Sequence, residues 1–320
     1  MFFGFDDDQV AFRDAVRDLL DKQCPPEVVR AAWDGDLDAQ VWRSLDEMGV
    51  LSLLVPESSG GLGLDERSLV MILEETGRAG LPHPIVETAA VAAPLLAAHD
   101  EPALSLVATD LGGRNIACAA DADRFLLHHG AELHLVEPDG VDLEPLATVD
   151  RARRAARLRW APAPATLLTD DPAVKALAFD RGALGVAAQL VGLGQRMLDM
   201  TVGYVTEREQ FGQPVGAFQA VKHHLADALK ELAFARPAVH RAAHSIAVAA
   251  DTRARDVSMA KAMASDAARF VGRQALQCHG AIGYTVEADL HLYLKRAWAL
   301  AGAWGDAAWH RDRVGRALGI

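Results

Sequence analysis

The sequence predicts a mainly helical protein with a small β region in its middle. Helical hydrophobic periodicity dominates the first hundred residues, short segments separated by glycine, aspartate and proline follow, and long helical patterns fill the rest. We therefore expect an N-terminal helical domain over residues 1–100, a shortened β domain over residues 101–170 and a C-terminal four-helix bundle over residues 171–320.

Start and stop signals place the N-terminal helices. Asp6–Asp8 precede an apolar series, and carboxylates at a helix start accept hydrogen bonds from its free amides and favour its dipole. Glu74 and Glu75 flank the apolar face of a later helix and are expected to be solvated. The helices expected in this region cover residues 10–20, residues 39–48, a segment that opens at Asp65, and residues 86–98.

The pattern changes near Pro102 and again at Pro172. Strands are expected in the segments LSLVATD (104–110), NIACAAD (115–121), RFLLHHG (124–130) and ELHLVEPDG (132–140). Long helices are expected over residues 177–206, 218–250 and 254–277, which is typical of a bundle. Pro237 should kink the second of them because it removes one hydrogen bond, and Gly192 and Gly194 should permit close packing of the first.

Composition excludes several classes of function. The 320 residues are 51% hydrophobic and 24% charged, with a formal net charge of −12, and so acidic a protein repels phosphate backbones and anionic lipid. We expect no nucleic-acid partner, no membrane partner, no secretion signal and a cytoplasmic location. Three isolated cysteines predict no disulfide framework. His240 and His244, one helical turn apart, are too few ligands to predict a metal site.

The first motif with chemical content is REQFGQPVGAFQ, which covers residues 208–219 and interrupts two long helices. Arg208 at the end of one helix and Gln219 at the start of the next can both face one anionic ligand. The planar fork of an arginine suits phosphate oxygens. A plain helix–helix turn with a solvated arginine also explains this spacing.

The second motif is QCHGAIGYT, which covers residues 277–285. Small residues at Gly280, Ala281 and Gly283 let backbone amides approach a ligand closely, as phosphate-binding loops require. The motif is not a dinucleotide-binding fingerprint, because it follows a helix and lacks the GxGxxG spacing. A helix end followed by a turn is the alternative reading.

A third candidate is a run of five arginines between Arg151 and Arg159. Such a run can bind the phosphates of a nucleotide or an acidic partner. The simpler interpretation is a solvated strand edge, since charged edges deter aggregation.

Taken together and in this order, the first two motifs resemble the C-terminal domain of the acyl-CoA dehydrogenase family. The segment VPESSGGLGLD (55–65) and the order of helical, β and helical regions are also similar, so the resemblance covers nearly the whole chain. It implies that FAD lies across a subunit interface, with the flavin ring in one subunit's β domain and the adenine and pyrophosphate on the neighbour's bundle. The residues that match the family's positions for this tail are Arg208, Gln210, Phe211, Gln219, Gln277, Gly280 and Ala281.

The resemblance also implies a reaction, the removal of two hydrogens from the α and β carbons of an acyl-CoA thioester. In the family a glutamate takes the α-proton while a hydride moves to flavin. The two family positions for that glutamate are matched here by Trp304 and Gly182, and neither side chain can act as a base. An arginine used for CoA is matched by Ala183, and the family's usual signatures near the flavin ring do not occur between Pro102 and Thr169. No catalytic residue is therefore expected in this chain.

These departures predict a non-catalytic subunit of a heteromeric acyl-CoA dehydrogenase. The chain resembles the degenerate subunits of actinobacterial α2β2 dehydrogenases that act on steroid-derived CoA thioesters. FAD would be shared with a partner subunit, which would supply the glutamate, the flavin-ring pocket and most of the acyl-CoA site. Two alternatives stay open: a self-sufficient homomeric dehydrogenase with an unorthodox base, and a flavin-free scaffold or binding protein on the same fold.

Overall fold

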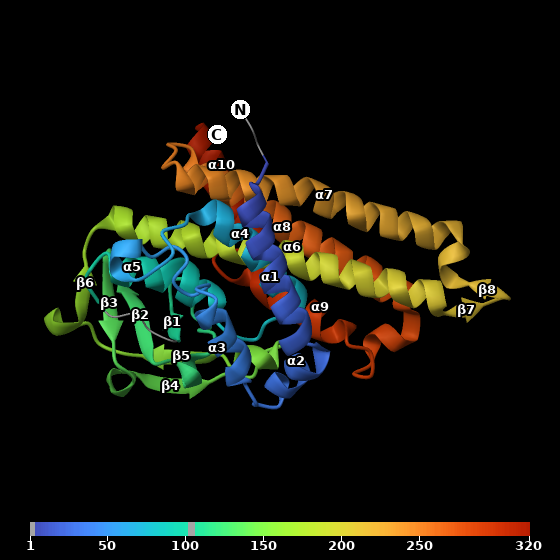
Figure 1. Ribbon diagram of the computed structural model, residues 1–320, viewed down its shortest axis with the longest axis horizontal. Helices are drawn as coiled ribbons and strands as arrows, with labels where there is room; N and C mark the ends of the chain where they lie inside the picture. The colour runs from blue at the N-terminus through green and yellow to red at the C-terminus, as the bar shows by residue number, and fades with distance from the viewer. Residues whose placement is uncertain (1–3, 102–105) are drawn as a thin grey trace.

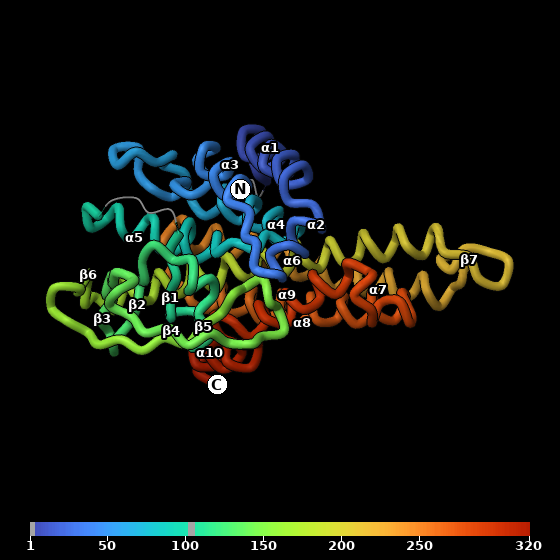
Figure 2. Tube along the Cα trace, turned by 90° about the horizontal axis from the view of Figure 1, so that it is seen from below, coloured from blue at the N-terminus to red at the C-terminus, as the bar shows by residue number. Residues whose placement is uncertain are grey.

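The computed structural model describes residues 4–101 and 106–320 and arranges the chain along a bundle of long helices (Figure 1). The N-terminal helices and the main sheet lie towards one end of this bundle, and a small hairpin projects from the other end (Figure 2). The bundle consists of α6 (Pro172–Glu207), α7 (Gln219–Ala247), α8 (Arg253–His279), α9 (Leu290–Gly302) and α10 (Ala307–Leu318). The expected fold class, mainly helical with a small β region, is confirmed.

The N-terminal region is helical, as predicted. Asp6 caps the first helix and forms a reciprocal pair of hydrogen bonds with Gln9, while Asp65 caps the helix that it was expected to open. The helix expected over residues 86–98 is π-helical over Val86–Ala92 and α-helical only in its last part. The α-helices are α1 (Asp7–Gln23), α2 (Pro26–Trp33), α3 (Ala39–Glu47), α4 (Glu66–Ala79) and α5 (Ala93–Ala97).

Two small sheets make up the β region. The first has the order β1-β2-β3-β6, in which β1 and β2 are parallel and the other pairs antiparallel. The second pairs β4 with β5, and its register places Arg157 opposite Glu144 and Arg159 opposite Asp142. The expected strand therefore holds for these two arginines only, because the first three arginines of the run lie in a 3-10 turn and its left-handed end. The strands are β1 (Val107–Thr109), β2 (Arg124–His129), β3 (Glu132–Val136), β4 (Asp142–Pro145), β5 (Ala156–Arg159) and β6 (Leu167–Thr169).

One expected strand is wrong. Within NIACAAD (115–121), Ile116 forms a single bridge to Ala156 and residues 119–121 form a 3-10 turn. Cys118 adopts a left-handed conformation with φ of 51°, which interrupts an extended chain. Of the segment LSLVATD, residues 107–109 form β1, while Leu104 and Ser105 lie outside the described residues.

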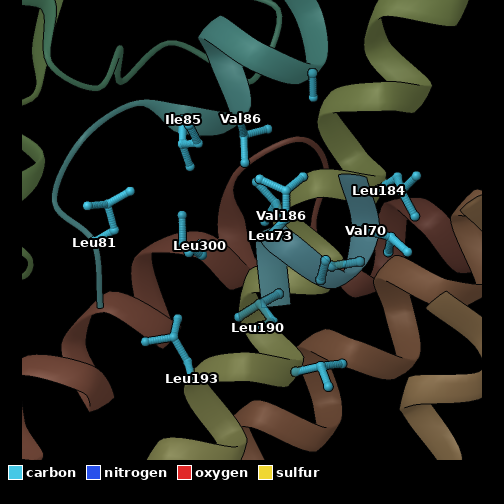
Figure 3. Close-up of a cluster of buried hydrophobic side chains, with 14 of the residues drawn as sticks. Val70, Leu73, Leu81, Ile85, Val86, Leu184, Val186, Leu190, Leu193 and Leu300 are labelled. Carbon is cyan, nitrogen blue, oxygen red and sulfur yellow. The ribbon is translucent and has the colours of Figure 1, made fainter. Parts of the chain in front are cut away.

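The core lies where α4 and the π-helical segment pack on α6. Leucine, valine and isoleucine side chains from these elements and from α9 meet there, including Leu73, Val86, Leu190 and Leu300 (Figure 3). Helix α6 is long and apolar enough to cross a membrane by composition, but 78% of its most apolar window is buried inside the protein. It is therefore accounted for as the core helix of this fold.

Gly192 lets α4 and α6 approach closely, as the sequence predicted. A Cβ atom at Gly192 would overlap the Glu74 carbonyl oxygen of α4, and one at Gly194 would lie 2.6 Å from the Leu232 side chain of α7. The Glu74 carbonyl is a backbone group, so it can make room for a side chain at Gly192 only if α4 and α6 move apart.

Gly192→Ala should lower the free energy of unfolding by about 1–3 kcal/mol, because overpacking a tight helix contact forces backbone shifts. Chemical denaturation measures the loss. Gly203→Ala on the same helix is the matched control, since a Cβ there meets nothing within 4 Å. Alanine has the higher helix propensity, so the control should be neutral or gain up to ~1 kcal/mol. Equal effects of the two changes would contradict close packing at Gly192.

Candidate functional site

A short hairpin connects α6 to α7 at one end of the bundle. It consists of β7 (Glu209–Gln210) and β8 (Gln213–Pro214), joined by Phe211 and Gly212, which both have positive φ values of 55° and 78°. Two consecutive left-handed residues give the turn that matches the twist of paired strands. Glycine adopts this conformation without strain, whereas phenylalanine does so at a cost.

The hairpin and the second motif meet in one pocket, which we name the bundle-end pocket. Its volume is about 480 Å³. Of the seven residues expected to hold the FAD tail, five line it: Arg208, Gln210, Gln277, Gly280 and Ala281. The remaining lining residues are Tyr204, Val215, Cys278, His279 and Ile282. Two motifs that are distant in sequence are therefore brought together, as the ligand interpretation requires.

Arg208 supplies the charge of the bundle-end pocket. Its backbone N–H donates to the Tyr204 carbonyl at 2.9 Å, and its own carbonyl accepts from the Val215 N–H at 2.7 Å, which ties the end of α6 to the turn before α7. Throughout residues 4–101 and 106–320 no carboxylate lies within ion-pairing distance of its guanidinium group. An unpaired guanidinium beside a pocket suits an anionic group such as a phosphate.

Gly280 opens the other side of the bundle-end pocket. It ends α8 with φ of 65°, and a Cβ atom there would have no neighbour within 4 Å, so the space next to the backbone is free. The η8 turn (Gly280–Tyr284) follows directly and carries Ala281 on the same wall. Close approach of a ligand to this backbone is therefore possible without moving a side chain.

Two stacked rings, Tyr204 and His279, line the bundle-end pocket between the two motifs. The rings of Tyr204 and His279 lie parallel, with centroids 4.5 Å apart and an interplanar angle of 12°. The His279 Nδ1 atom lies 2.8 Å from the Ala275 carbonyl and donates to it, and burial lowers the pKa of this imidazole. His279 is therefore neutral near pH 7. Tyr204 lies one helical turn before Arg208, so helical spacing from the motif could have indicated it.

Phe211 and Gln219 are not brought into the bundle-end pocket. Phe211 is 93% exposed at the hairpin tip, and its ring makes an edge contact with Phe218 at 6.2 Å between centroids. Gln219 begins α7, and its Nε2 atom lies 3.4 Å from His223. Both residues therefore lie outside the bundle-end pocket.

The two positions matched to a catalytic base contact one another. The Trp304 side chain is 1% exposed, and its indole packs so closely on Gly182 that a Cβ atom there would overlap the ring. A Cβ atom at Gly112 would lie 2.7 Å from the indole Nε1, and the Phe179 ring lies 5.9 Å from the indole. Ala183, matched to the CoA arginine, is buried in the core. The Trp304 indole thus fills the space between α6 and the turn after β1.

Backbone hydrogen bonds hold Trp304 in a strained conformation, with φ of 54°. Its N–H donates to the Gly112 carbonyl at 2.8 Å, and its carbonyl accepts from His310 Nε2 at 2.8 Å. Burial lowers the pKa of His310 to about 4, so the imidazole is neutral and donates this bond. The loop between α9 and α10 (residues 303–306) is therefore hydrogen-bonded both to the turn after β1 and to α10.

Lys261 supports the same loop from α8. It is 0% exposed and donates to the Gly305 carbonyl at 3.0 Å, the Ala301 carbonyl at 3.3 Å and the Ser265 hydroxyl at 3.1 Å. Burial lowers its pKa to about 7 and nearby Arg269 adds to this, although Asp306 opposes it. The sequence contained no signal for this residue, since a lysine on a helix is ordinarily solvated.

The expectation that Glu74 and Glu75 are solvated is wrong. Glu74 accepts from Arg236 at 3.0 Å and from His240 at 2.6 Å. Glu75 accepts from Arg17 at 2.5 Å and 2.9 Å and from Arg78 at 2.8 Å. Burial favours a raised pKa for Glu75, but the two guanidinium groups outweigh it and hold the pKa below its usual value. Glu74 is therefore paired with side chains of α7 and Glu75 with side chains of α1 and α4, and neither carboxylate is free in solvent.

Within the part of the chain that the structure describes, no three metal-ligating side chains gather. His240 is engaged by Glu74 and lies against the Phe5 ring, with centroids 4.9 Å apart. The chemistry available at the bundle end is therefore anion binding through a guanidinium group and backbone amides.

Two family models match this chain. The model described as acyl-CoA dehydrogenase, C-terminal domain, matches residues 173–319, and the one described as acyl-CoA dehydrogenase, N-terminal domain, matches residues 6–101. The β region lies between the two matched ranges. The bundle-end pocket lies within the first of them.

Curated relatives cover most of the chain. Acyl-CoA dehydrogenase IpdE2 of Mycolicibacterium smegmatis is 35% identical over 296 residues, which is 89% of this chain and 90% of the relative. Its counterpart in Mycobacterium tuberculosis is 33% identical over 295 residues, with 89% of each chain covered.

Among solved structures, the ChsE4-ChsE5 complex of Mycobacterium tuberculosis matches with a TM-score of 0.89 and 26% identity, covering 100% of this chain and 99% of the other. A structure described as the Tcur3481-Tcur3483 steroid ACAD G363A variant matches with a TM-score of 0.88 and 25% identity, covering 98% of each chain. With the motifs, the fold and these relatives in agreement, the chain belongs to the acyl-CoA dehydrogenase family.

Proposed function

We propose that this chain is the subunit of a heteromeric acyl-CoA dehydrogenase that holds the adenine and pyrophosphate half of FAD. A partner subunit, in an α2β2 assembly in the cytoplasm, supplies the catalytic glutamate, the flavin-ring pocket and most of the acyl-CoA site. The observation that carries the proposal is the contact of Trp304 with Gly182, because it leaves an indole and a glycine where the family resemblance places its base. General-base catalysis needs a group that can accept the α-proton.

The bundle-end pocket fits the tail of the flavin. Arg208 offers guanidinium N–H donors to pyrophosphate oxygens, and the backbone at Gly280 and Ala281 is open to close approach. Gln277 and Gln210 add amide groups that can donate or accept. When bound, FAD supplies the hydride acceptor of the desaturation, and the residues of this chain bind and orient its tail.

The relatives support a partner subunit and indicate the substrate class. One structural neighbour is described as a complex of two named proteins, and the other pairs two proteins under the words steroid ACAD. By analogy we propose α,β-desaturation of a steroid-derived acyl-CoA. The exposed Phe211 and Gln219, which one chain leaves outside the bundle-end pocket, then complete the flavin site together with the partner.

Co-expression tests the proposal. The chain is purified alone and together with a catalytic acyl-CoA dehydrogenase chain of the same organism, and flavin content and acyl-CoA oxidation are measured. We expect a colourless chain alone, and a yellow, active complex with one FAD for each pair of subunits. Stoichiometric FAD and acyl-CoA oxidation in the isolated chain would overturn the proposal.

Arg208→Ala should weaken FAD binding by the complex at least tenfold, because a hydrogen bond to a charged group contributes about 1.5–3 kcal/mol. The assembly itself should persist, and flavin released on dilution measures the affinity. Arg159→Ala is the matched control, since Arg159 is an exposed arginine on β5, outside the bundle-end pocket. Unchanged flavin retention in Arg208→Ala would contradict the role assigned to Arg208.

A further inference from the structure

A pocket of about 320 Å³ lies where α1, α4, α6 and α7 meet, and it shares no lining residue with the bundle-end pocket. We infer that this cavity, which we name the arginine pocket, binds a small organic phosphate. Neither the flavin site nor a second subunit is needed for this binding. Six of the lining residues carry a full charge at neutral pH: Arg13, Arg17, Glu74, Glu75, Arg78 and Arg236.

Positive charge is concentrated in the arginine pocket. Its four guanidinium groups and two carboxylates leave an excess of two positive charges, whereas the whole chain has a formal net charge of −12. Like charges held together repel more strongly where solvent is partly excluded. Only 17% of the Arg78 side chain and 27% of the Arg13 side chain are exposed. A bound anion would therefore offset the cost of gathering these groups.

Both carboxylates of the arginine pocket are already engaged by donors of this chain. The Glu74 Oε2 atom accepts from Arg236 at 3.0 Å, and its Oε1 atom lies 2.6 Å from His240 Nε2. The two oxygens of Glu75 accept from Arg17 at 2.5 and 2.9 Å. Every carboxylate oxygen in the pocket thus has a donor, so the other N–H groups of the arginines remain for a ligand.

Each of the four arginines keeps one terminal nitrogen without an acceptor. All four use their Nε and Nη2 atoms in hydrogen bonds to neighbouring side chains. Over residues 4–101 and 106–320 none of their Nη1 atoms donates a hydrogen bond, and Arg17 Nη1 lies 3.9 Å from Asp14, beyond hydrogen-bonding distance. Each Nη1 atom carries two N–H groups, which can donate to the oxygens of an anion.

A phosphate suits this arrangement better than a carboxylate. A phosphate monoester carries a charge of about −1.5 to −2 at pH 7, which matches the excess of two positive charges. It has three terminal oxygens that point in different directions, whereas the two oxygens of a carboxylate lie in one plane. The arginines come from α1, α4 and α7, so their guanidinium groups reach the pocket from separate elements.

The size and the apolar wall of the arginine pocket indicate an organic phosphate rather than the free ion. Small-molecule sites commonly measure about 300–1,000 Å³, and a phosphate ion alone fills only part of such a space. Phe5 and Met71 form an apolar wall beside the arginines. An apolar group attached to the phosphate would cover this wall and gain free energy by leaving water.

Titration calorimetry of the full chain with phenyl phosphate and with inorganic phosphate tests the inference. The chain should bind phenyl phosphate more tightly than inorganic phosphate, because the phenyl ring can contact Phe5 and Met71. Arg208 in the bundle-end pocket can also attract phosphate. Each titration is therefore repeated with Arg208→Ala, in which saturable binding of phenyl phosphate should persist.

Arg13→Gln and Arg236→Gln should each weaken binding of phenyl phosphate at least ~10-fold, since each removes a charged hydrogen-bond donor. Both variants should fold, because Arg13 contacts neither carboxylate of the pocket and Glu74 keeps its contact with His240 when Arg236 is replaced. Thermal unfolding without ligand checks this. Arg43→Gln on α3 is the matched control, since Arg43 is exposed and lies outside the arginine pocket, and it should leave the affinity unchanged.

Several results would overturn the arginine pocket as a phosphate site. One is the absence of saturable binding, and another is equal affinity in the wild type, Arg13→Gln and Arg236→Gln. Binding that Arg208→Ala abolishes would assign the phosphate to the bundle-end pocket instead. Tighter binding of succinate than of phenyl phosphate would identify a carboxylate site. None of these results changes the flavin content of a co-expressed complex, so the proposed function is tested separately.

Discussion

Trp304→Ala should lower the free energy of unfolding by about 3–5 kcal/mol, the largest loss that we expect from one substitution in this chain. The indole is fully buried between Gly182, Gly112 and Phe179, and its removal leaves a cavity that backbone atoms line on two sides. Glycine backbones cannot relax into that space as flexible side chains would. Urea denaturation followed by fluorescence or circular dichroism gives the value.

Trp309→Ala is the matched control for this prediction. Trp309 lies in the same aromatic cluster, with its ring 5.2 Å from Phe179, but it is exposed at the surface. Its removal creates no enclosed cavity, so the loss should stay near or below ~1 kcal/mol. Similar losses for both tryptophans would show that Trp304 is not the enclosed core residue described above.

Lys261→Met should abolish the rise in stability with pH that we expect of the wild type above neutrality. The folded-state pKa of Lys261 is about 7 against 10.5 for the free side chain, with burial as the main cause. Between these values the unfolded chain binds the proton and the folded chain does not, so the free energy of unfolding increases with pH by up to ~1.4 kcal/mol per unit. Below pH 7 both states are protonated, and the cost of burying the charge is fully present.

The measurement compares urea unfolding of the wild type and Lys261→Met between pH 7 and 8.5. Burial raises the pKa values of Cys24 and Cys118 to about 12, which lowers stability as pH rises towards and beyond 9. These thiols are present in both proteins, so their effect cancels in the difference. Lys22→Met, at an exposed position near the end of α1, should leave the slope of the wild type unchanged. Parallel pH profiles for Lys261→Met and the wild type would contradict a neutral buried amine.

The sequence predicted helices and strands correctly where neighbouring residues alone decide them, as at helix caps. Asp6 and Asp65 cap the helices they precede, and Gly192 lies at the close helix contact that its size suggested. The errors arose where tertiary contacts decide. The segment NIACAAD has the composition of a strand, but a left-handed Cys118 turns the chain there. Glu74 and Glu75 have the spacing of a solvated pair, but arginines from α1 and α7 enclose them.

The candidate site was predictable in part for the same reason. Motif residues identified five positions that line the bundle-end pocket, because the motif spacing reflects a local turn at the end of each helix. Tyr204 and His279, whose rings stack beneath them, come together only through the packing of α6 on α8. No local sequence signal indicated the roles of Lys261 and His310. Each side chain donates to a backbone carbonyl of the loop between α9 and α10, at Gly305 and Trp304 respectively, and the sequence does not reveal the position of those carbonyls.

Residue chemistry by itself determined that this chain carries no base at either matched position, because no fold turns an indole or a hydrogen atom into a proton acceptor. It also determined the helical class, since the period of the apolar residues is a local property. Only the tertiary structure decided that Trp304 and Gly182 touch and that Arg208 and Gly280 line one pocket. Those relations join residues far apart along the chain, and the packing of long helices sets their distances.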